Sequence, residues 1–153
     1  MMLDDIKTVL LRDLDRLQQE LHLYTKPATM WEITPGTANS AGNLALHLMG
    51  NLRHFIGNEL GKSGYVRQRE LEFSLKNVEL SQLDELIATC SSEISTALDF
   101  MDPSDLQKEF PKDFGGVKKK TSFVLLHLQG HFSYHLGQIN YHRRITESNI
   151  IGG

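Results

Sequence analysis

Three histidines near the end of the sequence, His131, His135 and His142, have a spacing that suits shared chemistry. They lie in a segment, residues 121–146, whose apolar side chains recur at steps of four and seven, as the buried stripe of a helix does. This stripe contains Val124, Leu128, Phe132 and Ile139, and the polar residues Gln129, Ser133, Asn140 and Arg144 collect on the opposite side. At 100° per residue, the three histidines fall within the stripe. Because an imidazole costs free energy when it is buried without a partner, these side chains need one.

A metal ion is one partner that His131 and His135 could share. Residues four apart on a helix have Cβ atoms about 5–6 Å apart, so two imidazoles there reach one ion at about 2.0–2.1 Å. The pair alone is a modest signal, since buried histidines also hydrogen-bond to backbone carbonyls. The prediction of a metal site therefore depends on a third ligand.

A third candidate, His47, lies in a second predicted helix. This helix begins near Asn39 or Ser40, both favourable N-cap residues, and runs to about Leu60. The residues around His47 are apolar on nearly every side, which is typical of a buried helix. His47 is therefore predicted to face the interior.

The set His47, His131 and His135 would bring three nitrogen ligands together. Three protein ligands are typical of a catalytic metal site, which leaves a fourth position for water or substrate. A structural zinc site usually has four ligands that include cysteine, and the only cysteine, Cys90, falls in a different predicted helix. The chain has no His-Glu-x-x-His and no Gly-x-Ser-x-Gly, which argues against a zinc protease of that type and against a serine hydrolase.

Two further helices are predicted without any candidate ligand. The first carries a regular apolar stripe, Leu3, Ile6, Leu10, Leu14, Leu17, Leu21 and Tyr24, and is closed by Pro27. The other is expected to start at a Ser81 cap and to end before Pro103. The only tryptophan, Trp31, is expected to plug a helix end or to cover a pocket. Residues 1–153 are thus predicted to form a single all-α domain with four long helices.

The connections and the small residues also indicate how the helices are arranged. The long connection Gly61–Asn77 is expected to join two helices that run in the same direction. Gly130, Ser133 and Gly137 would let another helix approach the last one closely, either within the domain or from a second subunit.

Composition narrows the choice of partners. A net charge of −3 gives no reason to expect nucleic acid or an anionic membrane as a partner. The start of the sequence does not resemble a signal peptide, and no apolar run is long enough to cross a bilayer. A single cysteine suits a reducing compartment, so a cytoplasmic location is expected.

Three stretches make the chain resemble the DinB/YfiT-like superfamily of small bacterial four-helix bundles, which is related to metal-dependent thiol transferases. The first is Trp31 with the following Pro-Gly and the run from Asn39 through His47 to Asn51-Leu-Arg. The second is Arg67-Gln-Arg-Glu-Leu-Glu-Phe. The third is Gly130-His-Phe-Ser-Tyr-His-Leu-Gly-Gln-Ile, where leucine follows His135 although arginine is common there in the family.

The resemblance implies that His47, His131 and His135 are the metal ligands, with zinc or nickel as the ion. It also implies an up-down-down-up four-helix bundle, with its long crossover between the second and third helices, and a homodimer. Members with known activity join low-molecular-weight thiols to electrophiles or hydrolyse related conjugates.

Three hypotheses for function follow. The leading one is a metal-dependent enzyme, either a thiol transferase or a hydrolase, that acts on a small molecule; its catalytic residues are unknown. Asn51, His54, Tyr134 and Gln138 lie in suitable helical phase to shape its pocket, although packing would explain each of them equally well. The second is a non-catalytic stress-response protein that binds a metal or a small molecule. The third is a structural bundle whose histidines are satisfied by hydrogen bonds.

Overall fold

The computed structural model describes residues 2–151 of the chain as a helical structure. Its elements are α1 (Met2–His22), the 3-10 helix η1 (Pro27–Trp31), α2 (Ala41–Leu52), the π-helix η2 (Arg53–Leu60), α3 (Arg69–Ser74), α4 (Leu80–Asp99), the 3-10 helix η3 (Pro103–Gln107) and α5 (Thr121–Ile151). The described residues contain no β-strand and only two isolated β-bridges. The all-α prediction is confirmed.

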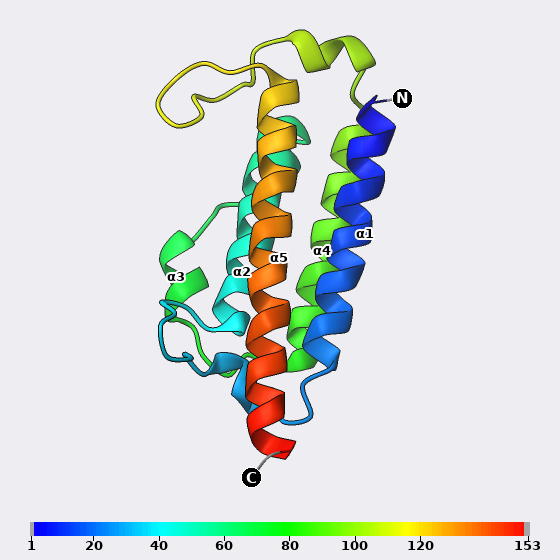
Figure 1. The fold of residues 1–153 in the computed structure, drawn as a ribbon. Helices are drawn as coiled ribbons and strands as arrows, with labels where there is room; N and C mark the ends of the chain where they lie inside the picture. The colour runs from blue at the N-terminus through cyan, green and yellow to red at the C-terminus, as the bar shows by residue number, and fades with distance from the viewer. Residues whose placement is uncertain (1, 152–153) are drawn as a thin grey trace.

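The long helices lie side by side, with α1 and α5 running in one direction and α2 and α4 in the other (Figure 1). Helix α1 packs against α4 and α5, α2 packs against α5, and η2 continues α2 along α4. The predicted count of four helices omitted α3, which lies on the outer side of α2 (Figure 1). Helix α3 is thus an α-helix beyond the four that were predicted.

The predicted apolar stripe of α1 forms one wall of the core. All seven of its residues are buried, as are the apolar residues of the α5 stripe: Leu3, Ile6, Leu10, Leu14, Leu17, Leu21, Tyr24, Val124, Leu128, Phe132 and Ile139. Trp31 is buried too, and it packs so closely on Gly42 that a Cβ atom there would overlap the indole ring. Trp31 therefore plugs the core beside the start of α2.

The start of α4 and the connection before it differ from the predictions. Helix α4 begins at Leu80 and not after a Ser81 cap, because the Glu79 amide donates to Gln82 Oε1 at 3.3 Å and closes the first turn earlier. The connection 61–77, for which no helix was predicted, contains α3. A helix of six residues has little stability of its own, so tertiary contacts must stabilise it.

The polar side of α5 faces α1. Gln129 Nε2 and Ser133 Oγ donate to the buried carboxylate of Asp13 at 2.8 and 3.1 Å, and Asn140 Nδ2 donates to Glu20 at 2.7 Å. These side chains thus link two helices by hydrogen bonds.

The glycines on α5 do not mark a close helix contact within the chain. A Cβ atom added at Gly130 or Gly137 would meet no heavy atom within 4 Å. The alternative, approach by a second subunit, stays a prediction, as does the homodimer. Among residues 2–151, no helix combines the length and the apolar character that crossing a bilayer requires.

Candidate metal centre

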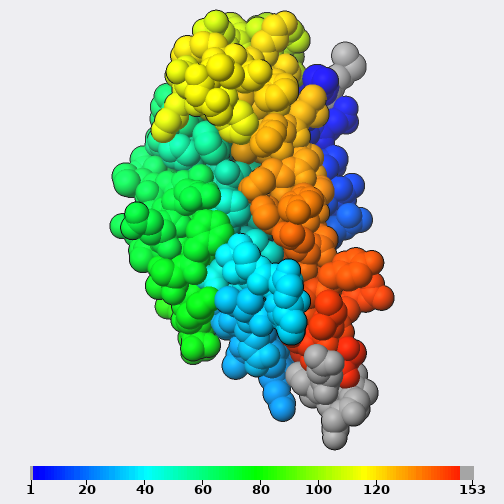
Figure 2. Space-filling model, turned by 60° about the vertical axis from the view of Figure 1, so that its left-hand side comes forward, coloured from blue at the N-terminus to red at the C-terminus, as the bar shows by residue number. Residues whose placement is uncertain are grey.

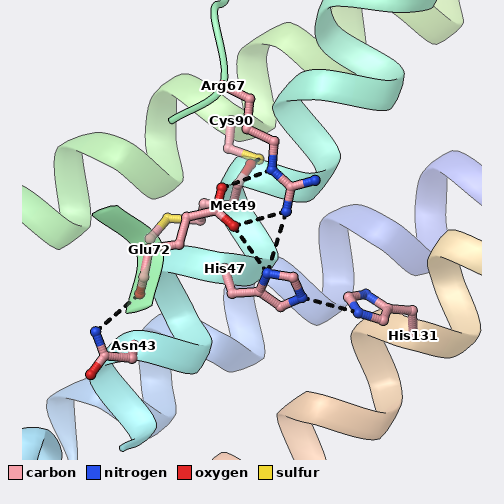
Figure 3. Close-up of polar contacts among 7 residues, drawn as sticks. All are labelled: Asn43, His47, Met49, Arg67, Glu72, Cys90 and His131. Carbon is pink, nitrogen blue, oxygen red and sulfur yellow. Dashed lines mark hydrogen bonds and ion pairs between the residues drawn. The ribbon is translucent and has the colours of Figure 1, made fainter. Parts of the chain in front are cut away.

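The three predicted ligands meet between α2 and α5. His47 comes from α2 and is buried, whereas His131 and His135 come from successive turns of α5 and are half-buried. Each offers one ligand atom, and these atoms all lie within 4.8 Å of one another. The Nε2 atoms of His47 and His131 are 3.2 Å apart, and the two rings point toward each other (Figure 3).

This geometry suits a divalent transition metal ion. Two nitrogens at 2.0–2.1 Å from a tetrahedral ion are separated by about 3.3 Å, which is close to the observed distance between His47 and His131. Neutral imidazole is a ligand that zinc, nickel and copper all accept. The donor set therefore fits such an ion, and with three protein ligands a further coordination position stays open.

A buried carboxylate holds the His47 ring in the orientation that the site needs. His47 Nδ1 lies 3.0 Å from Glu72 Oε1, which acts as the acceptor, so the proton is on Nδ1 and Nε2 keeps its lone pair (Figure 3). The lone pair faces the other two histidines. A carboxylate behind a metal-binding histidine fixes its tautomer and increases its basicity.

Arg67 keeps Glu72 ionised in this position. Its guanidinium donates from Nε to Oε2 and from Nη2 to Oε1, both at 2.8 Å. Burial alone would raise the pKa of Glu72, but the hydrogen bonds from Arg67 and His47 outweigh it and hold that pKa below its usual value. The carboxylate passes so close to α2 that a Cβ atom at Gly50 would overlap Glu72 Oε2 and would displace this carboxylate.

Helix α3 brings Glu72 to the site. Asn43 on α2 donates from Nδ2 to the backbone carbonyls of Glu72 and Leu75, at 3.0 and 2.8 Å, and so satisfies carbonyls at the end of α3. The Ser40 side chain caps α2 by accepting a hydrogen bond from the backbone N–H of Asn43 at 3.2 Å. Local capping of α2 thereby positions the residue that anchors α3.

His135 is oriented by a neighbour on its own helix. Its Nδ1 lies 2.7 Å from Gln138 Oε1, an acceptor, which leaves Nε2 of His135 free to bind an ion. His131 Nδ1 is a buried atom with no hydrogen-bond partner among the described residues. Its other nitrogen, Nε2, is the one that faces His47.

The surroundings of the cluster lower the pKa of two of its histidines. Burial, followed by the neighbouring His135 and His47, lowers the pKa of His131 to about 4. Burial also lowers the pKa of His135. Both rings are therefore neutral near pH 7, which is the form that binds metal.

The four predicted pocket residues are not all brought to the cluster. Tyr134 and Gln138 line a cleft together with His135. Asn51 is buried, and its Oδ1 has no hydrogen-bond partner among the described residues. His54 lies against Phe55, and its Nε2 is 3.4 Å from Lys112 Nζ.

Two other histidines of α5 are not part of the cluster. His142, placed in the same stripe by its spacing, accepts from the Tyr24 hydroxyl at 2.7 Å and donates to the Glu32 carbonyl at 2.8 Å. His127 stands four residues before His131, but its ring stacks almost parallel to that of His131, with centroids 6.4 Å apart. His142 is thus satisfied by hydrogen bonds, and His127 lies outside the group that could share an ion.

Sequence reasoning missed Glu72 and Arg67. The signal available was the cluster of charged residues, 67–72, inside a connection much longer than most. Charge alone could not assign Glu72 to His47, because the contact joins positions 25 residues apart through the fold of α3.

Comparisons of this chain with protein-family models, with curated proteins and with solved structures find no match.

Proposed function

We propose that the chain binds one divalent metal ion, zinc or nickel, through His47, His131 and His135 and uses it in chemistry on a small molecule. The observation that carries this proposal is the convergence of three imidazoles. In two of them, Nδ1 is already hydrogen-bonded within the protein: His47 Nδ1 to Glu72 and His135 Nδ1 to Gln138. Hydrogen bonds of this kind orient metal ligands before the ion arrives.

The reaction we propose is thiol transfer to an electrophile, with hydrolysis of a related conjugate as the variant. A bound ion would lower the pKa of a coordinated thiol or water. In the transfer, the thiol sulfur supplies both electrons of the new carbon–sulfur bond. The leaving group departs with the electron pair of the broken bond, and the thiol proton passes to solvent.

The chain's own residues would orient and tune this centre. Glu72 holds His47 and contributes a negative charge next to a ligand, while Arg67 keeps that carboxylate ionised. The half-buried positions of His131 and His135 leave one side of the cluster open to a substrate.

We also propose membership of the DinB/YfiT-like superfamily, with α1, α2, α4 and α5 as its four-helix bundle and the segment containing α3 as the crossover. The motifs around His47 and His135 support this proposal, as do the directions of the four helices in Figure 1. A cytoplasmic location and a small-molecule thiol as partner belong to the same proposal.

Metal content tests the proposal most directly. The wild type and His135→Ala, both purified without a histidine tag, would be incubated with zinc or nickel, desalted and measured by elemental analysis. We expect about one equivalent in the wild type and a large loss in the variant. His127→Ala is the matched control, because His127 lies one turn from His131 on the same helix but outside the cluster.

Turnover separates an enzyme from a binding protein. The loaded wild type and His135→Ala would be screened with low-molecular-weight thiols and a panel of electrophiles, with thiol consumption as the readout. Metal-dependent turnover supports the enzyme. Metal binding without any turnover favours the non-catalytic protein, and failure to bind metal leaves the histidines as core residues.

A further inference from the structure

A cleft of about 370 Å³ opens beside His135. It lies between the second half of α5 and the segment 34–39 that leads into α2, which are side by side in Figure 2. Its wall is formed by Thr34, Gly36, Thr37, Ala38, Asn39, Leu44, Tyr134, His135, Gln138, Tyr141, His142 and Ile145. The volume is within the range of small-molecule sites, about 300–1,000 Å³.

The cleft is continuous with the histidine cluster. His135 belongs to both, and Gln138, which accepts from His135 Nδ1 at 2.7 Å, also lines the cleft. A molecule with one group at the cluster would therefore extend along α5, past Gln138 and toward Tyr141.

The wall of the cleft has no acidic or basic residue apart from histidine. Both ring nitrogens of His142 are used within the protein, by Tyr24 and by the Glu32 carbonyl, so His142 offers no free nitrogen. Arg144 lies over the Tyr141 ring at 5.5 Å from its centroid and does not line the cleft. A carboxylate held along this wall would find no cationic side chain to pair with, and losing hydration without such a partner is unfavourable.

The same wall exposes apolar surface that a ligand could cover. Tyr134 and Tyr141 are each 65% exposed, and Ile145 is 47% exposed. Thr34, Thr37 and Asn39 line the same cleft and are uncharged; the two threonine hydroxyls hydrogen-bond to each other, and Thr37 Oγ1 also donates to the Thr34 carbonyl at 2.7 Å. An apolar wall with a few uncharged polar groups is typical of sites for amphipathic organic molecules.

We propose that this cleft binds the organic body of an uncharged, amphipathic substrate whose reacting group lies at the histidine cluster. The proposal rests on the proposed function, since it assigns a substrate class to the same centre. It places an uncharged molecule in the cleft, so an anionic thiol would approach the cluster from elsewhere.

The test compares two probes that carry the same metal-binding group. N-hydroxybenzamide is uncharged, and its 4-carboxy derivative adds one carboxylate. Affinities would be measured by calorimetry on the zinc-loaded chain at pH 7. We expect the wild type to prefer the uncharged probe by about tenfold or more, because the cleft gives the carboxylate no partner.

Two lysine variants test whether the preference for the uncharged probe arises in the cleft. Tyr141→Lys places a cation in the cleft, and we expect it to remove or reverse the preference for the uncharged probe. Leu126→Lys, at an exposed position of α5 outside the cleft, changes the net charge equally, and we expect it to keep the wild-type ratio.

Each outcome decides one of the two proposals. Equal affinity for both probes in the zinc-loaded wild type, or an unchanged ratio in Tyr141→Lys, would overturn the assignment of the cleft and leave the metal centre intact. Zinc content is measured on the same samples. A wild type that retains no zinc would overturn the metal centre, and the assignment of the cleft would fall with it.

Discussion

Glu72→Gln tests whether the buried carboxylate orients the metal site. The substitution keeps the shape of the side chain but removes its charge and one of two acceptor oxygens. In the wild type, Oε1 accepts from His47 Nδ1 at 3.0 Å, and the two oxygens accept from Arg67 at 2.8 Å each. The glutamine cannot accept all three bonds, because one of its two terminal atoms is a donor.

The expected consequence is weaker metal binding. Loss of a hydrogen-bond partner behind a metal ligand typically reduces metal affinity about 10- to 100-fold. That range corresponds to about 1.4–2.7 kcal/mol of binding free energy. Zinc dissociation constants would be measured at pH 7 by competition with a chromophoric chelator, after circular dichroism has shown that the variant is folded.

Glu93→Gln is the matched control. Glu93 on α4 accepts from Nε and Nη2 of Arg53 at 2.9 and 2.8 Å, which is the same two-bond arrangement, but it pairs with no ligand of the proposed ion. We expect wild-type zinc affinity in this variant. Wild-type affinity in Glu72→Gln would refute the orienting role, and an equal loss in both variants would point to a general loss of stability.

Three further predictions use the same protein. Gly50→Ala places a methyl group against Glu72 Oε2, so zinc affinity should fall in the same competition assay; unchanged affinity would show that Glu72 can shift without cost. Burial lowers the pKa of His131 from 6.5 to about 4, so the unfolded chain binds a proton at this residue before the folded chain does as the pH falls. The metal-free protein should therefore lose thermal stability between about pH 6.5 and 4, and His131→Asn should show a shallower dependence of thermal stability on pH. Asp13→Ala removes the carboxylate that accepts from both Gln129 and Ser133, so it should lower the unfolding free energy by about 1–3 kcal/mol in urea denaturation, without changing zinc affinity.

Periodicity identified much of the fold because it depends on neighbours along the chain. The stripes of α1 and α5 repeat at the helical period, and burial of one face follows from that period whatever the partner helix is. The start of α2 was likewise predictable from the sequence, since the Ser40 side chain accepts a hydrogen bond from the backbone N–H of Asn43, three residues away.

The sequence by itself determined the long helices and the candidate ligands on them, but not how the site is built. His127–His131 and His131–His135 have the same spacing, and only the orientation of α5 against α2 brings His135 rather than His127 to His47. The position of Glu72 was likewise decided by tertiary structure. Helix α3 is too short to form on local preference, and its contacts with Asn43, Arg67 and His47 come from distant or irregular parts of the chain.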